Sequence, residues 1–318
     1  MVAQDPTDPP ATHVADERST SEPPAKPSRP PSLRGSRALL TPPRINALLA
    51  AHGLRPSRSL GQNYLADPNT ARKVVRLAGV EAGETVLEVG PGLGSLTLAL
   101  RAAGVRVAAV EADGRLLPAL AEVLGDDPGV TVLVADALHA DLGAFAPEAR
   151  RLVANLPYGI AAPLVLRVLA ELPAIGHLTV MVQREVGERL AAPPASPAYG
   201  APSAKLAALA EARVLAPVSR RVFIPEPHVD SVLVGVRRRP HPALAGVGYP
   251  EVARVVDAAF SQRRKTLRNA LRTLGLGAGE VEALGRAAGV DLNLRAERLD
   301  LPAFAALARH VDPSSRRR

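Results

Sequence analysis

The stretch Asn155-Leu156-Pro157-Tyr158 carries the side chains best suited to chemistry in this sequence. It follows the apolar run 152–154, which predicts a buried strand, and Pro157 has no N–H with which to extend a ladder of strand hydrogen bonds. The Asn155 side chain and a free backbone carbonyl can accept hydrogen bonds from an exocyclic amine, and the Tyr158 ring offers a face to a flat base. An ordinary strand-ending turn with a packed tyrosine explains the tetrapeptide equally well.

A glycine-rich turn lies upstream of this stretch. Residues 85–89 predict a strand that passes through three alternate glycines, beginning at Gly90, into a helix. Glycines at such a turn allow bare backbone to approach a ligand. The next predicted strand, 105–110, ends in Glu111, which can accept hydrogen bonds from a ribose diol. These features fit any cofactor that contains a nucleoside.

A second acid, Asp136, follows the predicted strand 130–134 at the same edge of the sheet. Its carboxylate can accept a hydrogen bond from an adenine amine. The glycine pattern is G-x-G-x-G, whereas dinucleotide sites have G-x-G-x-x-G and hold a pyrophosphate. The glycine turn and the two acids therefore favour S-adenosylmethionine over a dinucleotide. Each acid taken alone is equally compatible with a solvated strand end.

Three further strands are predicted at 177–183, 213–218 and 231–236. Together with the four upstream strands they indicate an α/β fold with a Rossmann-like seven-stranded sheet and a terminal hairpin, the architecture of S-adenosylmethionine-dependent methyltransferases. Phe223 precedes two prolines that stiffen its loop, and it is either a second wall of a base clamp opposite Tyr158 or a core residue.

The Pro/Ala-rich segment 191–203 is expected to be a mobile loop near the target base. From residue 248 the pattern becomes helical, and residues 260–272 predict one amphipathic helix with Phe260, Leu267, Leu271 and Leu274 on its apolar face. Basic side chains suited to a nucleic-acid backbone accompany it, namely Arg263, Arg264, Lys265, Arg268 and Arg272. A solvated basic face is the alternative interpretation.

Composition narrows the class of protein. The 318-residue chain contains no cysteine, and its 7 histidines show no paired ligand spacing, so we expect neither disulfides nor a metal. No apolar run approaches the roughly 18 to 20 residues that span a bilayer, and we expect a cytoplasmic protein that binds no membrane. The net charge of +8 carries little weight by itself, because the sequence is rich in arginine throughout.

Four regions are expected along the chain. Residues 1–42 are rich in Pro and Ser and predict a disordered extension, and the acids within it argue against a transit peptide. Residues 43–245 are expected to form the catalytic domain that binds S-adenosylmethionine. Residues 246–312 are expected to form a small all-α domain that binds RNA, followed by a basic tail at 313–318.

Seven motifs occur in a fixed order, namely LGQNYL, LEVGPGLGSLT, VEAD, ADAL, NLPY, FIPEPHVDS and AFSQRRKTLRNAL. Over about residues 43–312 the chain resembles the 16S rRNA adenine N(6),N(6)-dimethyltransferases of the KsgA/RsmA type. The resemblance implies a monomeric enzyme that dimethylates two adjacent adenosines in the hairpin near the 3′ end of 16S rRNA, within an immature small ribosomal subunit. It also implies S-adenosylmethionine as methyl donor, S-adenosylhomocysteine as product, and no metal.

The same resemblance assigns roles to individual residues. It implies cofactor contacts at Asn63, Leu65, Gly90, Glu111, Asp136 and Asn155, and a target-base site at Asn155, Pro157, Tyr158 and Phe223. Three departures from the family pattern occur. Tyr64 replaces the usual Phe, Gly159 and Ala161-Ala162 replace Asn and Ser-Thr, and Ala201-Pro202 is unusual after Tyr199-Gly200.

Two other functions remain open at this point. The related 23S rRNA adenine methylases that confer macrolide resistance share the glycine loop and the Asn-x-Pro-aromatic motif. A non-catalytic rRNA-binding assembly factor would also use the basic segment, but it would have no need of Glu111, Asp136 and Asn155.

Overall fold

The computed structural model describes residues 38–57, 60–240, 244, 246–262 and 264–311. Residues 37–318 form one compact unit. Most of the expected extension, Arg263 and the basic tail lie outside the described residues. The described chain is already part of the fold at Leu40, which is 4% exposed and packs against helix α1 (Pro42–Ala51).

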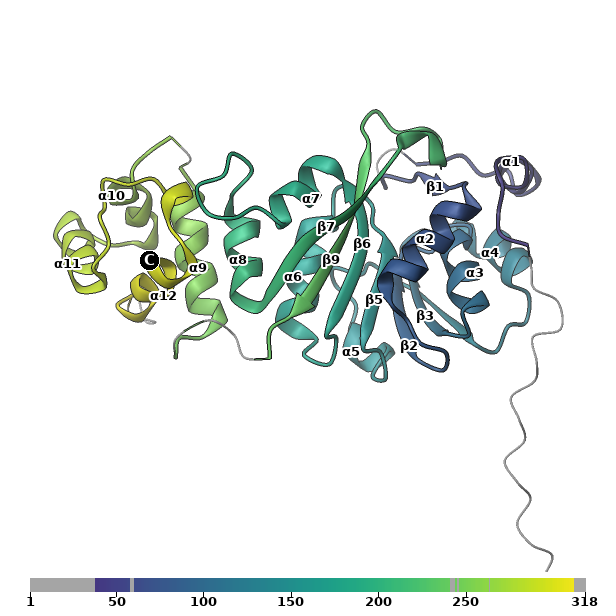
Figure 1. Ribbon diagram of the computed structural model, residues 1–318, viewed down its shortest axis with the longest axis horizontal. Helices are drawn as coiled ribbons and strands as arrows, with labels where there is room; N and C mark the ends of the chain where they lie inside the picture. The colour runs from purple at the N-terminus through teal and green to yellow at the C-terminus, as the bar shows by residue number, and fades with distance from the viewer. Residues whose placement is uncertain (1–37, 58–59, 241–243, 245, 263, 312–318) are drawn as a thin grey trace, which may run out of the picture. The chain divides into compact units, whose positions relative to one another are not determined.

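Seven strands form one sheet in the order β4-β3-β2-β5-β6-β9-β7 (Figure 1). The strands are β2 (Thr85–Val89), β3 (Arg106–Glu111), β4 (Val130–Val134), β5 (Arg151–Asn155), β6 (His177–Gln183), β7 (Ala210–Val218) and β9 (Ser231–Arg238). Neighbouring strands are parallel except at β9, which is antiparallel to both β6 and β7. The chain winds outward in opposite directions from β2 and β5, and such a switch point leaves a crevice at the carboxyl ends of the two strands.

The two faces of the sheet belong to separate apolar clusters, because successive side chains of a strand point to opposite faces. In β5, Leu152 and Ala154 pack with helix α6 (Ala161–Glu171), whereas Val153 packs with α2 (Pro68–Ala78) and α3 (Ser95–Ala102). Three further helices complete this part of the chain, namely α4 (Leu117–Leu124), α5 (Leu142–Phe145) and α7 (Arg184–Leu190). The predicted α/β class and all seven predicted strands are confirmed.

A second sheet of two short strands was not predicted. Strands β1 (Tyr64–Leu65) and β8 (Phe223–Ile224) pair in antiparallel fashion, with Leu65 opposite Phe223. The Ala66 N–H extends the pairing by donating to the Val222 carbonyl at 2.7 Å. This pairing ties the segment before α2 to the loop between β7 and β9.

The region after residue 248 is helical, as predicted. It contains α9 (Tyr249–Phe260), α10 (Leu267–Ala270), α11 (Ala278–Ala288) and α12 (Leu301–Arg309), with 3₁₀ turns at Leu271–Leu274 and Ala296–Arg298. Helix α8 (Ala201–Leu209) packs against both α7 and α9, and one continuous apolar cluster runs from the sheet through α8 to Phe304 of α12. None of the helices that the structure describes combines the length and the apolar character needed to cross a bilayer.

The prediction of a single helix at 260–272 is wrong. Helix α9 ends at Phe260, and α10 begins only at Leu267. The backbone N–H groups of Leu267 and Arg268 donate to the carbonyls of Leu294 (2.9 Å) and Leu292 (3.0 Å), so tertiary hydrogen bonds replace those of a continuous helix. The apolar side chains are nevertheless buried, with Leu267 and Leu271 each 0% exposed.

The expected loop at 191–203 is shorter than predicted. Helix α8 starts at Ala201, with Gly200 as its N-cap and a proline in its first turn, where proline lacks only an N–H that would have no partner in the helix. Tyr199 is 5% exposed and meets Phe260 edge to face, with ring centroids 5.9 Å apart. The unusual Ala201-Pro202 pair is thus a helix start.

Candidate active site

A cavity of about 410 Å³ lies at the carboxyl ends of strands β2 to β5, at the switch point of the sheet. The glycine turn, the residues after β3 and β4, and the 155–160 segment line it, together with residues 60–65 from the segment around β1. The predicted residues brought together there are Asn63, Leu65, Gly90, Glu111, Asp136, Asn155, Pro157 and Tyr158. Parallel strands place their carboxyl ends at one edge of a sheet, which explains how residues far apart in sequence converge.

The Glu111 carboxylate binds the backbone of the glycine turn. Its Oε2 accepts the Gly92 N–H at 3.0 Å, and its Oε1 accepts the Asp113 N–H at 2.9 Å. Gly92 has a φ of 58°, a conformation that favours glycine. A Cβ at that position would also lie 3.1 Å from Cδ1 of Tyr64. Burial raises the pKa of Glu111, and the backbone donors offset part of that rise.

Glu88, in strand β2 two residues before Gly90, is a cavity residue that the sequence argument did not select. It is 1% exposed, and its Oε2 accepts a hydrogen bond from the Thr97 hydroxyl at 2.7 Å. Burial raises its pKa to about 8. Within the described part of the chain, Glu88 Oε1 and the Ser95 hydroxyl are buried with no hydrogen-bond partner. Because buried polar groups are normally paired, these two atoms fit a polar group of a ligand.

The charge of the cavity discriminates between the two cofactor classes. Glu111 and Asp136 line it together with the buried Glu88, whose raised pKa keeps it mostly protonated at neutral pH, and no Lys or Arg is found among the described lining residues. A dinucleotide would bring a pyrophosphate into this acidic surrounding, which like charges oppose. S-adenosylmethionine carries a sulfonium and an ammonium group, so the donors and charges of the cavity fit it.

Asn155 is the last residue of β5, and its side-chain oxygen is free to accept a hydrogen bond, as the sequence argument requires. Its Nδ2 donates to the backbone carbonyl of Asn63 at 3.1 Å. This donation fixes the assignment of the two amide atoms, which the hydrogen-bond network decides. The Oδ1 atom has no hydrogen bond among the described residues and remains an acceptor at the cavity.

Tyr158 borders the same cavity and is half-buried. Its hydroxyl lies 3.4 Å from Oγ of Ser231, and burial raises its pKa. Gly61 lies against the 155–158 turn. A Cβ on Gly61 would stand 3.4 Å from the Tyr158 nitrogen and 3.6 Å from Cβ of Pro157. The segment around β1 therefore lies against the 155–158 motif.

Comparisons with known proteins agree with this geometry. Residues 53–311 match the family described as Ribosomal RNA adenine dimethylase. The chain belongs to this family. It is 49% identical to Ribosomal RNA small subunit methyltransferase A of Thermobifida fusca, over 86% of this chain and 96% of that protein. It is 47% identical to the protein of the same name in Streptomyces coelicolor, over 86% and 97% of the two chains.

Solved structures give the same fold. A dimethyladenosine transferase from Plasmodium falciparum aligns with a TM-score of 0.63 and 22% identity, covering 76% of this chain and 95% of that one. The 23S rRNA methyltransferase ErmE aligns with a TM-score of 0.58 and 28% identity, covering 78% and 99%. This chain is thus a methyltransferase with the predicted Rossmann-like sheet.

Phe223 of this dimethylase chain does not line the cavity. Its side chain is 3% exposed and packs in the cluster of Leu65, Val218 and Leu233 beneath the β1–β8 pair. Phe223 is therefore a core residue in this structure, and its part in a base clamp opposite Tyr158 stays a prediction. The strand pairing of Phe223 with Leu65 explains the placement, and two-residue strands leave no readable sequence pattern.

The basic residues follow α9, with Arg264 and Lys265 between α9 and α10, Arg268 in α10, and Arg272 in the 3₁₀ turn at Leu271–Leu274. Arg264, Lys265 and Arg272 are exposed and make no ion pair with any described residue. Arg268 differs, because it pairs with Glu282 and donates to the Asn293 side chain at 3.3 Å. Since the helix is interrupted, Arg264 does not lie on one helix with Arg268 and Arg272, as the single helix expected at 260–272 would require.

Proposed function

We propose that this protein dimethylates the exocyclic amine of two adjacent adenosines in the hairpin near the 3′ end of 16S rRNA, using S-adenosylmethionine. The observation that carries the proposal is the Asn155 carboxamide, which presents a free Oδ1 at an acidic cavity built for a cationic cofactor. Family membership and the small-subunit names of its relatives support the same substrate. We further propose that the enzyme acts as a cytoplasmic monomer on an immature small subunit.

The chain's own residues account for cofactor binding. S-adenosylmethionine would supply an electrophilic methyl group. We assign Glu111 to the ribose hydroxyls, Asp136 to the adenine amine, and Gly90, Asn63 and Leu65 to backbone contacts along the cavity. Asp136 is held for this role by the Leu138 N–H, which donates to its Oδ1 at 2.8 Å.

Asn155 and the turn after it orient the target amine. The lone pair of an adenine amine is delocalised into the ring, which makes the amine a poor nucleophile. Acceptors placed for the pyramidal amine, here Asn155 Oδ1 and a backbone carbonyl of the 155–158 turn, hold its N–H groups and direct the lone pair toward the methyl group. Water can take the proton afterwards, and the described lining residues include no His or Lys.

Extraction of the base from its stack costs a few kcal/mol. Stacking on the Tyr158 ring returns about 1 to 3 kcal/mol of that cost. The exposed cations Arg264, Lys265 and Arg272 supply contacts to RNA phosphates, which bind without regard to sequence and hold the hairpin near the cavity.

The direct test is methylation of immature small subunits that lack the modification, followed by mass spectrometry of the nucleosides. We expect N(6),N(6)-dimethyladenosine at two adjacent positions of 16S rRNA, and Asn155→Ala should reduce it by at least about 100-fold, as the loss of one transition-state hydrogen bond does in other enzymes. Primer extension on both rRNAs covers the second candidate, a 23S rRNA methylase, which the structural likeness to ErmE brings forward. A stop on 23S rRNA alone would refute the proposal.

A further inference from the structure

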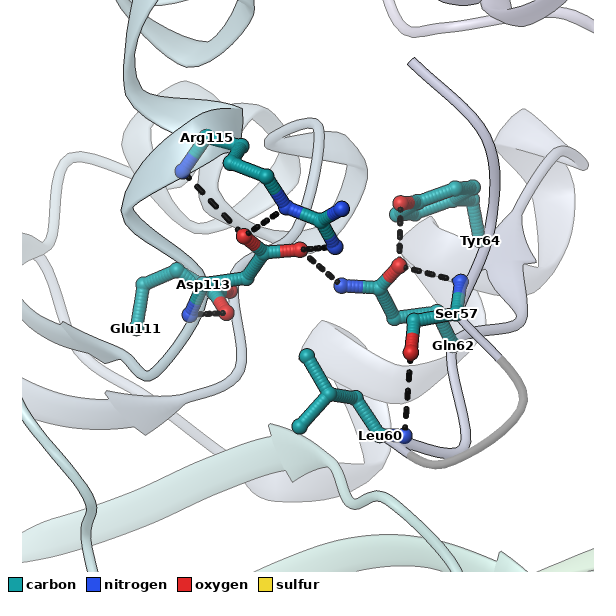
Figure 2. A network of polar contacts seen from close by, with 7 residues as sticks. All are labelled: Ser57, Leu60, Gln62, Tyr64, Glu111, Asp113 and Arg115. Carbon is teal, nitrogen blue, oxygen red and sulfur yellow. Dashed lines mark hydrogen bonds and ion pairs between the residues drawn. The ribbon is translucent and has the colours of Figure 1, made fainter.

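Gln62 is the centre of a polar network that connects separate walls of the cavity (Figure 2). Its Nε2 donates to Oδ2 of Asp113 at 2.8 Å. Its Oε1 accepts two hydrogen bonds, from the Ser57 N–H at 2.8 Å and from the Tyr64 hydroxyl at 3.0 Å. The Gln62 side chain thus binds a residue that lies 51 positions further along the sequence.

The two donors to Oε1 fix the orientation of the Gln62 carboxamide. If the amide were rotated by half a turn, its NH₂ would face the Ser57 N–H and its oxygen would face the Asp113 carboxylate, and the bonds to both would be lost. The Tyr64 hydroxyl matters most among these donors, because Tyr64 is only 5% exposed and its phenol has no other hydrogen-bond partner among the described residues. Burial raises the pKa of Tyr64, so its hydroxyl stays a donor.

Asp113 transmits the contact to the ribose side of the cavity. Two nitrogens of Arg115 donate to the Asp113 carboxylate at 2.8 and 2.7 Å and lower the pKa of Asp113 to about 2. The acceptor for Gln62 is therefore ionised throughout the working pH range. The backbone N–H of Asp113 in turn donates to Glu111 Oε1 at 2.9 Å. A shift of Gln62 is thus carried through Asp113 to the carboxylate that we assign to ribose.

The residues next to Gln62 hold two other walls. The Asn63 carbonyl accepts the Nδ2 of Asn155 at 3.1 Å and so presents its Oδ1. The Tyr64 ring lies over Gly92 of the glycine turn. Three consecutive residues therefore contact the ribose side, the target-base side and the glycine turn.

We propose that the Tyr64 hydroxyl and the Gln62 carboxamide form a clip that sets the spacing between the Glu111 and Asn155 walls, so that both are positioning residues for cofactor binding. The inference rests on the proposed use of S-adenosylmethionine. Neither side chain is needed as a direct ligand, because the clip acts through Asp113 and through the Asn63 backbone. A device of this kind increases affinity by reducing the ordering that the ligand must impose on the site.

The test is Tyr64→Phe in the full chain, which removes one oxygen and keeps the ring on the glycine turn. We expect the dissociation constant of S-adenosylhomocysteine, measured by calorimetry, to rise about three- to tenfold, as the loss of one net hydrogen bond predicts. The KM for S-adenosylmethionine should rise by the same factor, with RNA affinity unchanged. In the Gln62→Ala background the same substitution should have no effect, because the partner is gone.

Tyr199→Phe is the matched control, because Tyr199 is equally buried at 5% exposure but packs against Phe260 away from the cavity. Additive effects of Tyr64→Phe and Gln62→Ala, or equal effects of Tyr64→Phe and Tyr199→Phe, would overturn the clip. Amide hydrogen exchange of residues 60–65 in the ligand-free protein is an independent test of the clip. If these amides were equally protected in Tyr64→Phe and in the wild type, the clip would also be overturned. A wild-type chain that binds no S-adenosylhomocysteine would instead refute the proposed function.

Discussion

Replacement of Glu111 by alanine separates cofactor binding from RNA binding. Glu111 is the carboxylate that we assign to the two ribose hydroxyls, and it lies 6% exposed at the cavity. A hydrogen bond to a charged acceptor contributes about 1.5 to 3 kcal/mol. Two such bonds give about 3 to 6 kcal/mol, so Glu111→Ala should weaken binding of S-adenosylhomocysteine by about 10² to 10⁴-fold.

The fold itself should tolerate this change. Glu111→Ala leaves the N–H groups of Gly92 and Asp113 without their acceptor, but the adjoining cavity lets water replace the carboxylate. Removal of a buried acid whose pKa is raised also relieves its cost of burial. We therefore expect the affinity for cofactor to fall far more than the free energy of unfolding.

Calorimetry with S-adenosylhomocysteine and filter binding with the 16S hairpin measure the two activities. Glu148→Ala is the charge control, because it removes one acid whose side chain is 70% exposed on the surface. RNA binding by Glu111→Ala should match that of the control within about twofold, since a surface charge substitution changes little. Parallel loss of cofactor and RNA binding in a folded variant, or unchanged cofactor affinity, would refute the assignment of Glu111.

Three other outcomes are expected. The double substitution Arg264→Ala with Lys265→Ala should weaken RNA binding and reduce the slope of log K against log salt by about 1.5, whereas an unchanged slope would contradict the phosphate contacts. Glu88→Gln should stabilise the ligand-free protein at pH 8 but not at pH 4.5. The pKa of Glu88 in the folded protein is about 8, which exceeds its ordinary value. The stability that protonated Glu88 contributes is therefore lost as the pH rises from 4.5 to 8. An equal effect of Glu88→Gln on the melting temperature at both pH values would exclude this. Phe304→Ala, at a 0% exposed position, should cost about 3 to 5 kcal/mol in urea unfolding, and a loss below about 1 kcal/mol would contradict its place in the core.

Much of the fold follows from local patterns. The strands are short β-branched runs that end in glycine or in polar residues, and all seven are found within three residues of their predicted starts. The glycine turn and Glu111 converge because parallel strands share an edge, which is a property of the topology and can be inferred without coordinates.

The features that were missed depend on long-range partners. The helix expected through Leu267 is broken because two backbone amides find carbonyls at 292 and 294 instead. The bond from Gln62 to Asp113 joins a loop to a strand end, and no periodicity encodes it. The sequence around Phe223 fits either a clamp or a core residue, and its burial opposite Leu65 depends on a strand pairing that no local pattern encodes.

The continuous apolar cluster from the sheet to α12 has a consequence for how this protein can change. Because α8 and α9 lie against each other and belong to one apolar cluster, the helices after residue 248 cannot be exchanged as a unit without repacking the half that contains the sheet. Heat or denaturant should melt both halves together, in one cooperative step. Divergence toward a new RNA target is then easiest on the exposed loops, such as that of Arg264 and Lys265, while the interior stays as it is.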